Sequence, residues 1–124
     1  MEQERFSLHS RIKSFQYAGA GLRAIFKTDH NVWIHFTATA IVIALSIYLK
    51  VSSSDAALLT IAIGLVWVSE LFNTCIEKMM DFISRDIHPA IKLIKDVSAA
   101  AVLIAAITAV VIGCCVFIPK IMYI

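Results

Sequence analysis

The chain has 124 residues, of which 60% are apolar and only 16% are charged, and its mean hydropathy is +0.83. A soluble domain of this length buries only about two-thirds of its unfolded surface, so this apolar excess excludes a soluble globular protein and indicates a lipid bilayer. The formal net charge of +2 is small, so the positions of the charges are more informative than their sum.

The first segment, about residues 7–28, predicts an amphipathic helix that lies on the membrane surface. Apolar side chains recur along it at spacings of mostly three and four residues, as they do on one face of a helix. These side chains are Phe6, Ile12, Phe15, Ala18, Leu22, Ile25 and Phe26. Cations interrupt the pattern, so the segment lacks the apolar core of a signal peptide and we expect it to be retained.

Three further segments predict transmembrane helices, because each approaches the roughly 20 apolar residues that a bilayer core requires. They cover about residues 32–49, 56–80 and 97–118. The first contains no acid, lysine or arginine and one histidine, His35, and the third contains none of these residues. The second is unusual, because it carries Glu70 and Glu77 within an otherwise apolar sequence.

The third segment carries small residues at four-residue steps, which let helix backbones approach closely in lipid. The stripe consists of Ala101, Ala105, Ala109 and Gly113. Packing among the spans of one chain and association between chains explain this stripe equally well.

The placement of lysine and arginine predicts how the chain is oriented, because cytoplasmic loops carry an excess of these residues. Five precede the first span and four lie between the second and the third, whereas only Lys50 and Lys120 lie on the opposite side. We therefore expect the N-terminus and the 78–96 segment to face the cytoplasm. Within that segment, Lys92 is interpreted as a loop charge that faces anionic lipid headgroups.

The strongest chemical signal is the run S-E-L-F-N-T-C-I-E-K-M-M-D, Ser69–Asp81. Five of its polar side chains fall within a sector of about 100° on one helix face. They are Glu70, Asn73, Thr74, Glu77 and Asp81. A carboxylate within a membrane costs at least a few kcal/mol, so these acids favour a functional site. The structural alternative is that they only pair with Lys78, Lys95 or Arg23 and hold helices together.

Acids also stand at the cytoplasmic ends of the other two spans, at Asp29 and Asp96. Clustered oxygens are the ligands of Mg²⁺, which binds through a few carboxylates and completes its shell with water and phosphate oxygens. The sequence contains neither a G-x-x-x-x-G-K-[ST] phosphate loop nor protein-kinase motifs, so a nucleotide site must be built differently. The residues alone therefore indicate a polytopic membrane protein with an acidic site.

The chain resembles the prokaryotic diacylglycerol kinase and undecaprenol kinase family from about Arg11 to Lys120. The main motifs are E-L-F-N-T-C-I-E-K-M-M-D, from Glu70, and H-P-A-I-K-L-I-K-D-V-S-A-A-A-V-L-I, from His88, at the family's own separation. The runs K-S-F-Q-Y-A-G-A-G-L-R-A and T-D-H-N-V-W-I-H nearer the N-terminus add to the resemblance. Its I-H-P-x-x-K-x-x-K-D run and F-I-P-K end look closer to undecaprenol kinases than to the diacylglycerol enzymes.

This resemblance implies an all-α membrane enzyme, a single domain over residues 1–124 with one surface helix and three transmembrane helices, assembled as a homotrimer. Its implied activity is phosphorylation of a membrane lipid hydroxyl by ATP with Mg²⁺. Undecaprenol is the favoured acceptor and diacylglycerol the alternative. The implied partners are the lipid, ATP and other copies of the chain, with no nucleic acid.

Two other classes of function remain as alternatives. A non-catalytic membrane adaptor gives no reason to place Glu70, Asn73 and Glu77 on one face. A proton-coupled carrier places its acids nearer the bilayer middle and usually has more than three spans.

The resemblance also implies roles for individual residues. Glu70 resembles the catalytic base that takes the proton of the lipid hydroxyl, and Asn73 and Ala99 resemble residues that line the same site. Glu77 and Asp29 would hold Mg²⁺ with the nucleotide phosphates, and Asp29 is one methylene shorter than the family's usual glutamate. Lys95 resembles a charge partner of the phosphates. The other positions expected to bind ATP are Tyr17, Asp86, His88 and Asp96.

Overall fold

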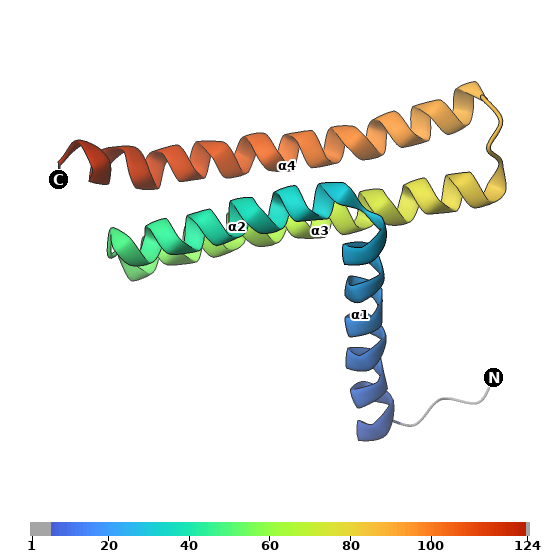
Figure 1. Cartoon of the computed structure of the whole chain (residues 1–124), viewed down its shortest axis with the longest axis horizontal. Coiled ribbons are helices and arrows are strands. Elements are labelled where there is room, and N and C mark those ends of the chain that lie inside the picture. Colours follow the sequence, from blue (N-terminus) through green and yellow to red (C-terminus); the bar gives the residue numbers. More distant parts are fainter. Residues whose placement is uncertain (1–5, 124) are drawn as a thin grey trace. The chain divides into compact units, whose positions relative to one another are not determined.

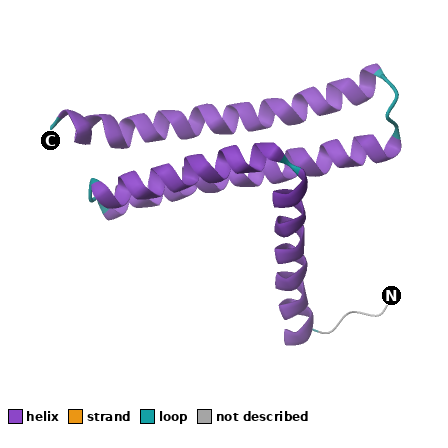
Figure 2. Cartoon of the chain, in the orientation of Figure 1, coloured by secondary structure: helices purple, strands orange, loops and turns teal. Residues whose placement is uncertain are grey.

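The computed structural model describes residues 6–123, and every regular element in that range is a helix (Figures 1 and 2). The helices are α1 (Leu8–Thr28), α2 (His30–Tyr48), α3 (Ser53–Ile83) and α4 (Pro89–Met122). The predicted all-α fold is therefore confirmed. Arg5, one of the cations used to predict the orientation, lies outside the described residues.

The described chain divides into two compact units, residues 6–37 and residues 38–123, with the boundary inside α2. The first unit contains α1 and the beginning of α2. The second contains the rest of α2 together with α3 and α4.

Helices α2, α3 and α4 are long and apolar enough to cross a membrane. They contain 19, 31 and 34 residues. At about 1.5 Å per residue α2 is roughly 29 Å long, α3 roughly 47 Å and α4 roughly 51 Å. A hydrocarbon core is about 30 Å thick, so α3 and α4 must continue well beyond it. Their polar ends are thus rigid helical extensions into the aqueous interface.

Helix α4 begins at Pro89, well before the predicted span at about residue 97. His88 is its N-cap residue, and the Nδ1 atom of His88 accepts a hydrogen bond of 3.1 Å from the backbone N–H of Ala90. A proline is favourable in the first turn, because its missing N–H has no partner there and its φ already suits a helix. The predicted span begins at about residue 97 because it was placed by hydropathy, and hydropathy does not include the polar first turns of the helix.

The interpretation of Lys92 as a loop charge is therefore wrong. Lys92 lies in the first turns of α4, and its ammonium pairs with the carboxylate of Asp96 four residues later. Both side chains are exposed, so the pair adds only a few tenths of a kcal/mol, about 0.3–0.5, to the helix.

The second unit is built around the antiparallel pair of α3 and α4, which lie side by side (Figure 1). Its apolar core consists of Leu59 on α3 and Val116 and Phe117 on α4. Partly buried residues pack around this core; they are Val42, Leu45, Leu49, Val51 and Ile112. Close to the same end, the Nζ atom of Lys120 lies 3.7 Å from the Oδ2 atom of Asp55.

One of the four small residues in the stripe on α4 is buried within the chain. Ala105 is buried, Ala109 and Gly113 are partly buried, and Ala101 is exposed. In lipid, small side chains permit close helix contact without a hydrophobic driving force. A Cβ added at Gly113 would meet nothing within 4 Å, so close packing within the chain is seen at Ala105 and the rest of the stripe stays open to both explanations.

A hydrogen bond also connects α2 to α3 within the second unit. The Nε1–H group of Trp67 donates to the Oγ1 atom of Thr39 over 2.9 Å, and both side chains are partly buried. Tryptophan N–H groups need such a partner when they leave water. Trp67 therefore packs between helices.

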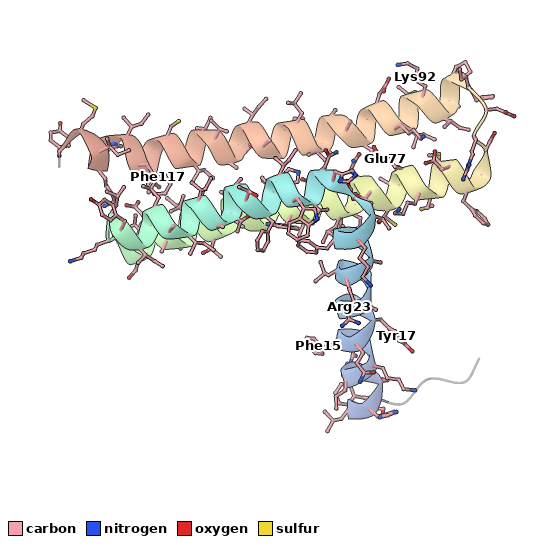
Figure 3. All side chains as sticks on the ribbon, viewed as in Figure 1. Phe15, Tyr17, Arg23, Glu77, Lys92 and Phe117 are labelled. Atoms are coloured by element: carbon pink, nitrogen blue, oxygen red, sulfur yellow. The ribbon has the colours of Figure 1, made fainter. Side chains whose placement is uncertain are left out.

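In the first unit, the corner between α1 and α2 is formed by aromatic rings. The ring of Phe26 meets those of Trp33 and Phe36 edge to face, with centroids 5.2 and 5.8 Å away. The Nε1–H group of Trp33 also donates to the carbonyl oxygen of Phe26 over 3.0 Å. Helix α1 itself has no buried residue, and Figure 3 shows Phe15, Tyr17 and Arg23 projecting from it.

Candidate functional site

Four polar side chains are buried in the described part of the chain, and all lie on α3 or α4. They are Glu70, Asn73, Thr74 and Ser98, with exposed fractions of 3%, 8%, 4% and 7%. On α3 they alternate with the exposed residues Phe72 and Cys75. The predicted common face of Glu70, Asn73 and Thr74 is therefore confirmed, and it points into the second unit.

Asn73 connects the two helices through both ends of its carboxamide. The Oγ–H group of Ser98 on α4 donates to the Oδ1 atom of Asn73 over 2.7 Å. The Nδ2 group of Asn73 donates to the Oε1 atom of Glu77 over 3.4 Å, at the long end of the hydrogen-bond range. Buried Ser98 is thus connected through Asn73 to the exposed carboxylate of Glu77.

A second contact between α3 and α4 lies one helical turn beyond Glu77. The Nζ atom of Lys95 donates to the Oδ1 atom of Asp81 over 2.6 Å. Their side chains are 37% and 54% exposed, so water screens the pair and it contributes little to stability. The structural alternative of acids pairing with cations is therefore realised at Asp81. Glu77 stands between this pair and the Ser98–Asn73 hydrogen bond.

Ser98 was not singled out from the sequence, although a signal for it exists. It is one of two hydroxyl residues in the apolar stretch from Val97 to Ile118. It also follows Lys95 by three residues, a spacing that places both on one helix face. A hydroxyl on the same face as a candidate phosphate partner is thus a signal that points to the site.

The other positions expected on α4 and before it make local contacts. The backbone N–H of Asp86 donates to the Oγ atom of Ser84 over 3.1 Å in the connection between α3 and α4. His88 caps α4, Asp96 pairs with Lys92, and Ala99 is exposed. Asp96 and Lys95, which the motif places next to each other, thus have different partners.

Tyr17 and Asp29 belong to the first unit. Tyr17 is exposed and, with six other residues, lines an open groove along α1; they are Phe6, Ser7, Ser10, Arg11, Lys13 and Ser14. Asp29 separates α1 from α2, and its Oδ1 atom accepts a hydrogen bond of 3.0 Å from the backbone N–H of Asn31. A carboxylate at a helix N-terminus is stabilised by the helix dipole. The joint metal site of Asp29 and Glu77 stays a prediction, because the two residues lie in different units.

The side chains around Glu77 suit a hard cation. Within residues 6–123, no group of three or more His, Cys, Asp or Glu side chains converges on one point. Mg²⁺ needs fewer protein ligands than that, since one or two carboxylates and the phosphates of a substrate are its usual set. The side chain of Glu77 is exposed, and one of its carboxylate oxygens accepts a hydrogen bond from Asn73. A carboxylate oxygen that solvent can reach fits Mg²⁺ as a ligand.

These features define the class of protein: an all-helical membrane protein with a polar site between two of its spanning helices. Residues 16–117 match the family described as prokaryotic diacylglycerol kinase. The chain is 39% identical over 111 residues to a diacylglycerol kinase of Synechocystis, covering 88% of this chain and 63% of that protein. The chain belongs to the prokaryotic diacylglycerol kinase family, a family of membrane lipid kinases.

Two further relatives align with this chain over a larger share of their own length. The undecaprenol kinase of Bacillus subtilis is 32% identical over 119 residues, which is 96% of this chain and 97% of the relative. The diacylglycerol kinase of Escherichia coli is 32% identical over 103 residues, 83% of this chain and 84% of the relative. The names of these relatives thus include two different lipid acceptors.

Proposed function

We propose that this protein transfers the γ-phosphoryl group of ATP to the hydroxyl of a membrane lipid. The observation that carries the proposal is the buried carboxylate of Glu70, one helical turn from the Asn73–Glu77 hydrogen bond, in a chain of this family. A buried acid is expensive in a membrane and is retained where it has chemical work to do. An adaptor leaves this arrangement without a purpose, and a proton-coupled carrier would usually have more than three spans.

Glu70 is proposed as the general base. The oxygen of the lipid hydroxyl forms a bond to the γ-phosphorus, and the bond from that phosphorus to the bridging oxygen of ADP breaks. ADP leaves with the bonding electron pair, and the carboxylate of Glu70 takes the hydroxyl proton. Asn73 and Ala99 line the place where the hydroxyl lies. Phosphoryl transfer depends mainly on such positioning and on charge neutralisation, because the transition state is loosely bonded.

Glu77, with Asp29, is proposed to hold the Mg²⁺ that accompanies ATP. When bound, Mg²⁺ neutralises the negative charge that develops on the phosphate oxygens. Lys95 supplies a second positive charge to the phosphates by exchanging its exposed partner Asp81 for them. Tyr17, Asp86, His88 and Asp96 complete the proposed ATP-binding surface.

The acceptor proposed for this protein is undecaprenol, with diacylglycerol as the alternative. The relative named undecaprenol kinase aligns with 97% of its own length, and the motif from Ile87 to Asp96 resembles those enzymes. Apolar walls discriminate weakly between lipids, since one methylene changes binding by only about 1–3 kcal/mol. A direct comparison of the two lipids is therefore the decisive measurement.

The proposed assembly is a homotrimer in a bacterial inner membrane, with the N-terminus and the active site in the cytoplasm. In the most apolar 18-residue stretch of each spanning helix, the buried share is 6% in α2 and 17% in both α3 and α4. A large apolar surface therefore remains for lipid and for other copies of the chain. The charges at residues 78–96 support the cytoplasmic placement.

Phosphate transfer by the purified protein tests the proposal. Micelles are doped with either undecaprenol or diacylglycerol, and radiolabelled ATP is supplied with Mg²⁺. We expect label to appear in the lipid fraction, faster with undecaprenol, and to disappear when Mg²⁺ is chelated. Absence of transfer to both lipids by folded protein would contradict the kinase assignment, and faster transfer to diacylglycerol would reverse the acceptor.

A further inference from the structure

The hydroxyl of Ser98 behaves differently from three other hydroxyls in the spanning helices. Ser46, Thr60 and Thr108 each donate to the carbonyl oxygen four residues earlier in their own helix. This local bond is the usual one for serine and threonine within a helix. Ser98 instead donates across to Asn73 on α3, over 2.7 Å and in a buried position. Its hydroxyl is therefore used to connect helices.

The contact determines which way the carboxamide of Asn73 faces. A carboxamide has an accepting oxygen at one end and a donating nitrogen at the other, and a half-turn about its last torsion exchanges them. Ser98 donates to the oxygen, and the nitrogen consequently faces the carboxylate of Glu77. The reverse orientation would place an oxygen against that carboxylate.

Glu77 alone holds the carboxamide only weakly. The separation of Nδ2 and Oε1 is 3.4 Å, and a cation that withdraws electron density from the carboxylate weakens it as an acceptor. The Ser98 contact, at 2.7 Å, involves no metal ligand directly. It can keep the carboxamide in place both before and after metal binding.

We infer that Ser98 is a positioning residue, whose hydroxyl orients Asn73 so that Asn73 in turn holds Glu77 ready for the Mg²⁺–nucleotide complex. The inference rests on the proposed function, because it assigns Glu77 to the metal. Side chains that orient metal ligands through hydrogen bonds typically change metal affinity or activity by about 10–100-fold when they are replaced.

Calorimetric binding of a non-hydrolysable ATP analogue, AMP-PNP, to the full-length protein in micelles tests the inference without turnover. Ser98→Ala is expected to weaken binding of the Mg²⁺ complex by about 10-fold, and to leave binding of metal-free AMP-PNP in EDTA unchanged. Ser98→Cys, of similar volume but a weak donor, should behave like Ser98→Ala. Thr108→Val is the matched control, because it removes a hydroxyl of the same helix that bonds only to Ile104.

The restored hydroxyl provides a further check. Ser98→Thr should recover most of the affinity for the Mg²⁺ complex, and Ser98→Ala should add little to the loss that Asn73→Ala already causes. In turnover assays, the KM for Mg²⁺–ATP should rise more than kcat falls.

The positioning role is overturned if Ser98→Ala and Ser98→Cys bind the Mg²⁺ complex within twofold of the unmodified protein. It is also overturned if Thr108→Val shows the same loss, or if the metal-free affinity falls equally. Failure of the proposed function looks different: the unmodified protein would bind AMP-PNP yet phosphorylate neither lipid, or would not bind it at all.

Discussion

The two ends of the α3–α4 pair are joined by different chemistry. One end has a core of Leu59, Val116 and Phe117, whereas the other has the buried polar residues Asn73 and Ser98. Figure 3 shows Phe117 towards the C-terminal end of α4, far along the helices from Glu77. Close packing and interhelical hydrogen bonds can each hold helices together in lipid, so the two ends differ mainly in the chemical groups that they offer to a substrate.

The ion pairs at the two ends sharpen this contrast. Lys120 and Asp55 lie 3.7 Å apart with side chains about one-third exposed, whereas Lys95 and Asp81 lie 2.6 Å apart and are more exposed. Neither pair contributes much stability at such exposure. The ion pair of Lys95 and Asp81 lies close to Glu77. In the proposed mechanism, Lys95 leaves Asp81 and binds the phosphates of the substrate.

The largest expected contrast between the ends is their accessibility to labelling. With the native cysteines replaced, a cysteine at position 85 should react with a membrane-impermeant reagent only from the cytoplasm, and one at position 53 only from outside. The reason is the excess of lysine and arginine at the polar end. Labelling of position 85 from outside in intact cells would reverse the proposed orientation.

Glu77→Gln is expected to abolish turnover at ordinary Mg²⁺ concentration. The change removes the charge that binds the metal and retains the side-chain volume, so folding and assembly should persist. The measurement is lipid phosphorylation across a Mg²⁺ titration, with size-exclusion chromatography as the control for assembly. Near-normal turnover of this variant would remove Glu77 from the metal site.

Glu70→Gln should lower turnover by about 10²- to 10⁴-fold, the range for loss of one positioned base. Nucleotide affinity and thermal stability should stay unchanged, because the amide fills the same space. If Glu70 were instead a buried structural acid holding a cation, the change would cost roughly 3–5 kcal/mol of stability. Loss of assembly before loss of activity, or full activity, would therefore exclude the role of base.

Phe117→Ala tests the apolar end. Replacing a buried phenylalanine costs about 3–5 kcal/mol in a soluble core, and we expect less here because lipid offers an apolar alternative to the unpacked helices. Denaturation in mixed micelles should show reduced stability, while the folded fraction keeps its specific activity. A matching loss of specific activity would mean that the two ends are coupled.

The smallest effect is expected for Asp81→Asn, which removes the competitor for Lys95. ATP should bind more tightly by no more than about fivefold, because an exposed ion pair is weak. Asp55→Asn is the control, because it breaks the equivalent pair at the apolar end and should leave ATP affinity unaltered. Weaker ATP binding by Asp81→Asn would show that Asp81 supports Lys95 rather than competing for it.

The sequence alone determined the helical class and the three spans, because hydropathy and helical periodicity are properties of each segment by itself. It also placed Glu70, Asn73 and Thr74 on one face, since a rigid helix turns by a constant angle at each residue. The family followed from two long motifs at their own spacing. Each of these results depends on residues that are near one another in the chain.

The tertiary structure decided which residues of different helices meet. The contacts of Ser98 with Asn73 and of Lys95 with Asp81 depend on how α4 is rotated and shifted along α3. That register results from close packing of side chains such as Ala105, Val116 and Phe117 along the whole pair, and no single helix contains it. The sequence named Lys95 only as one of three possible partners for the acids of α3. The partner of a side chain on another helix therefore appears only when both helices are packed together.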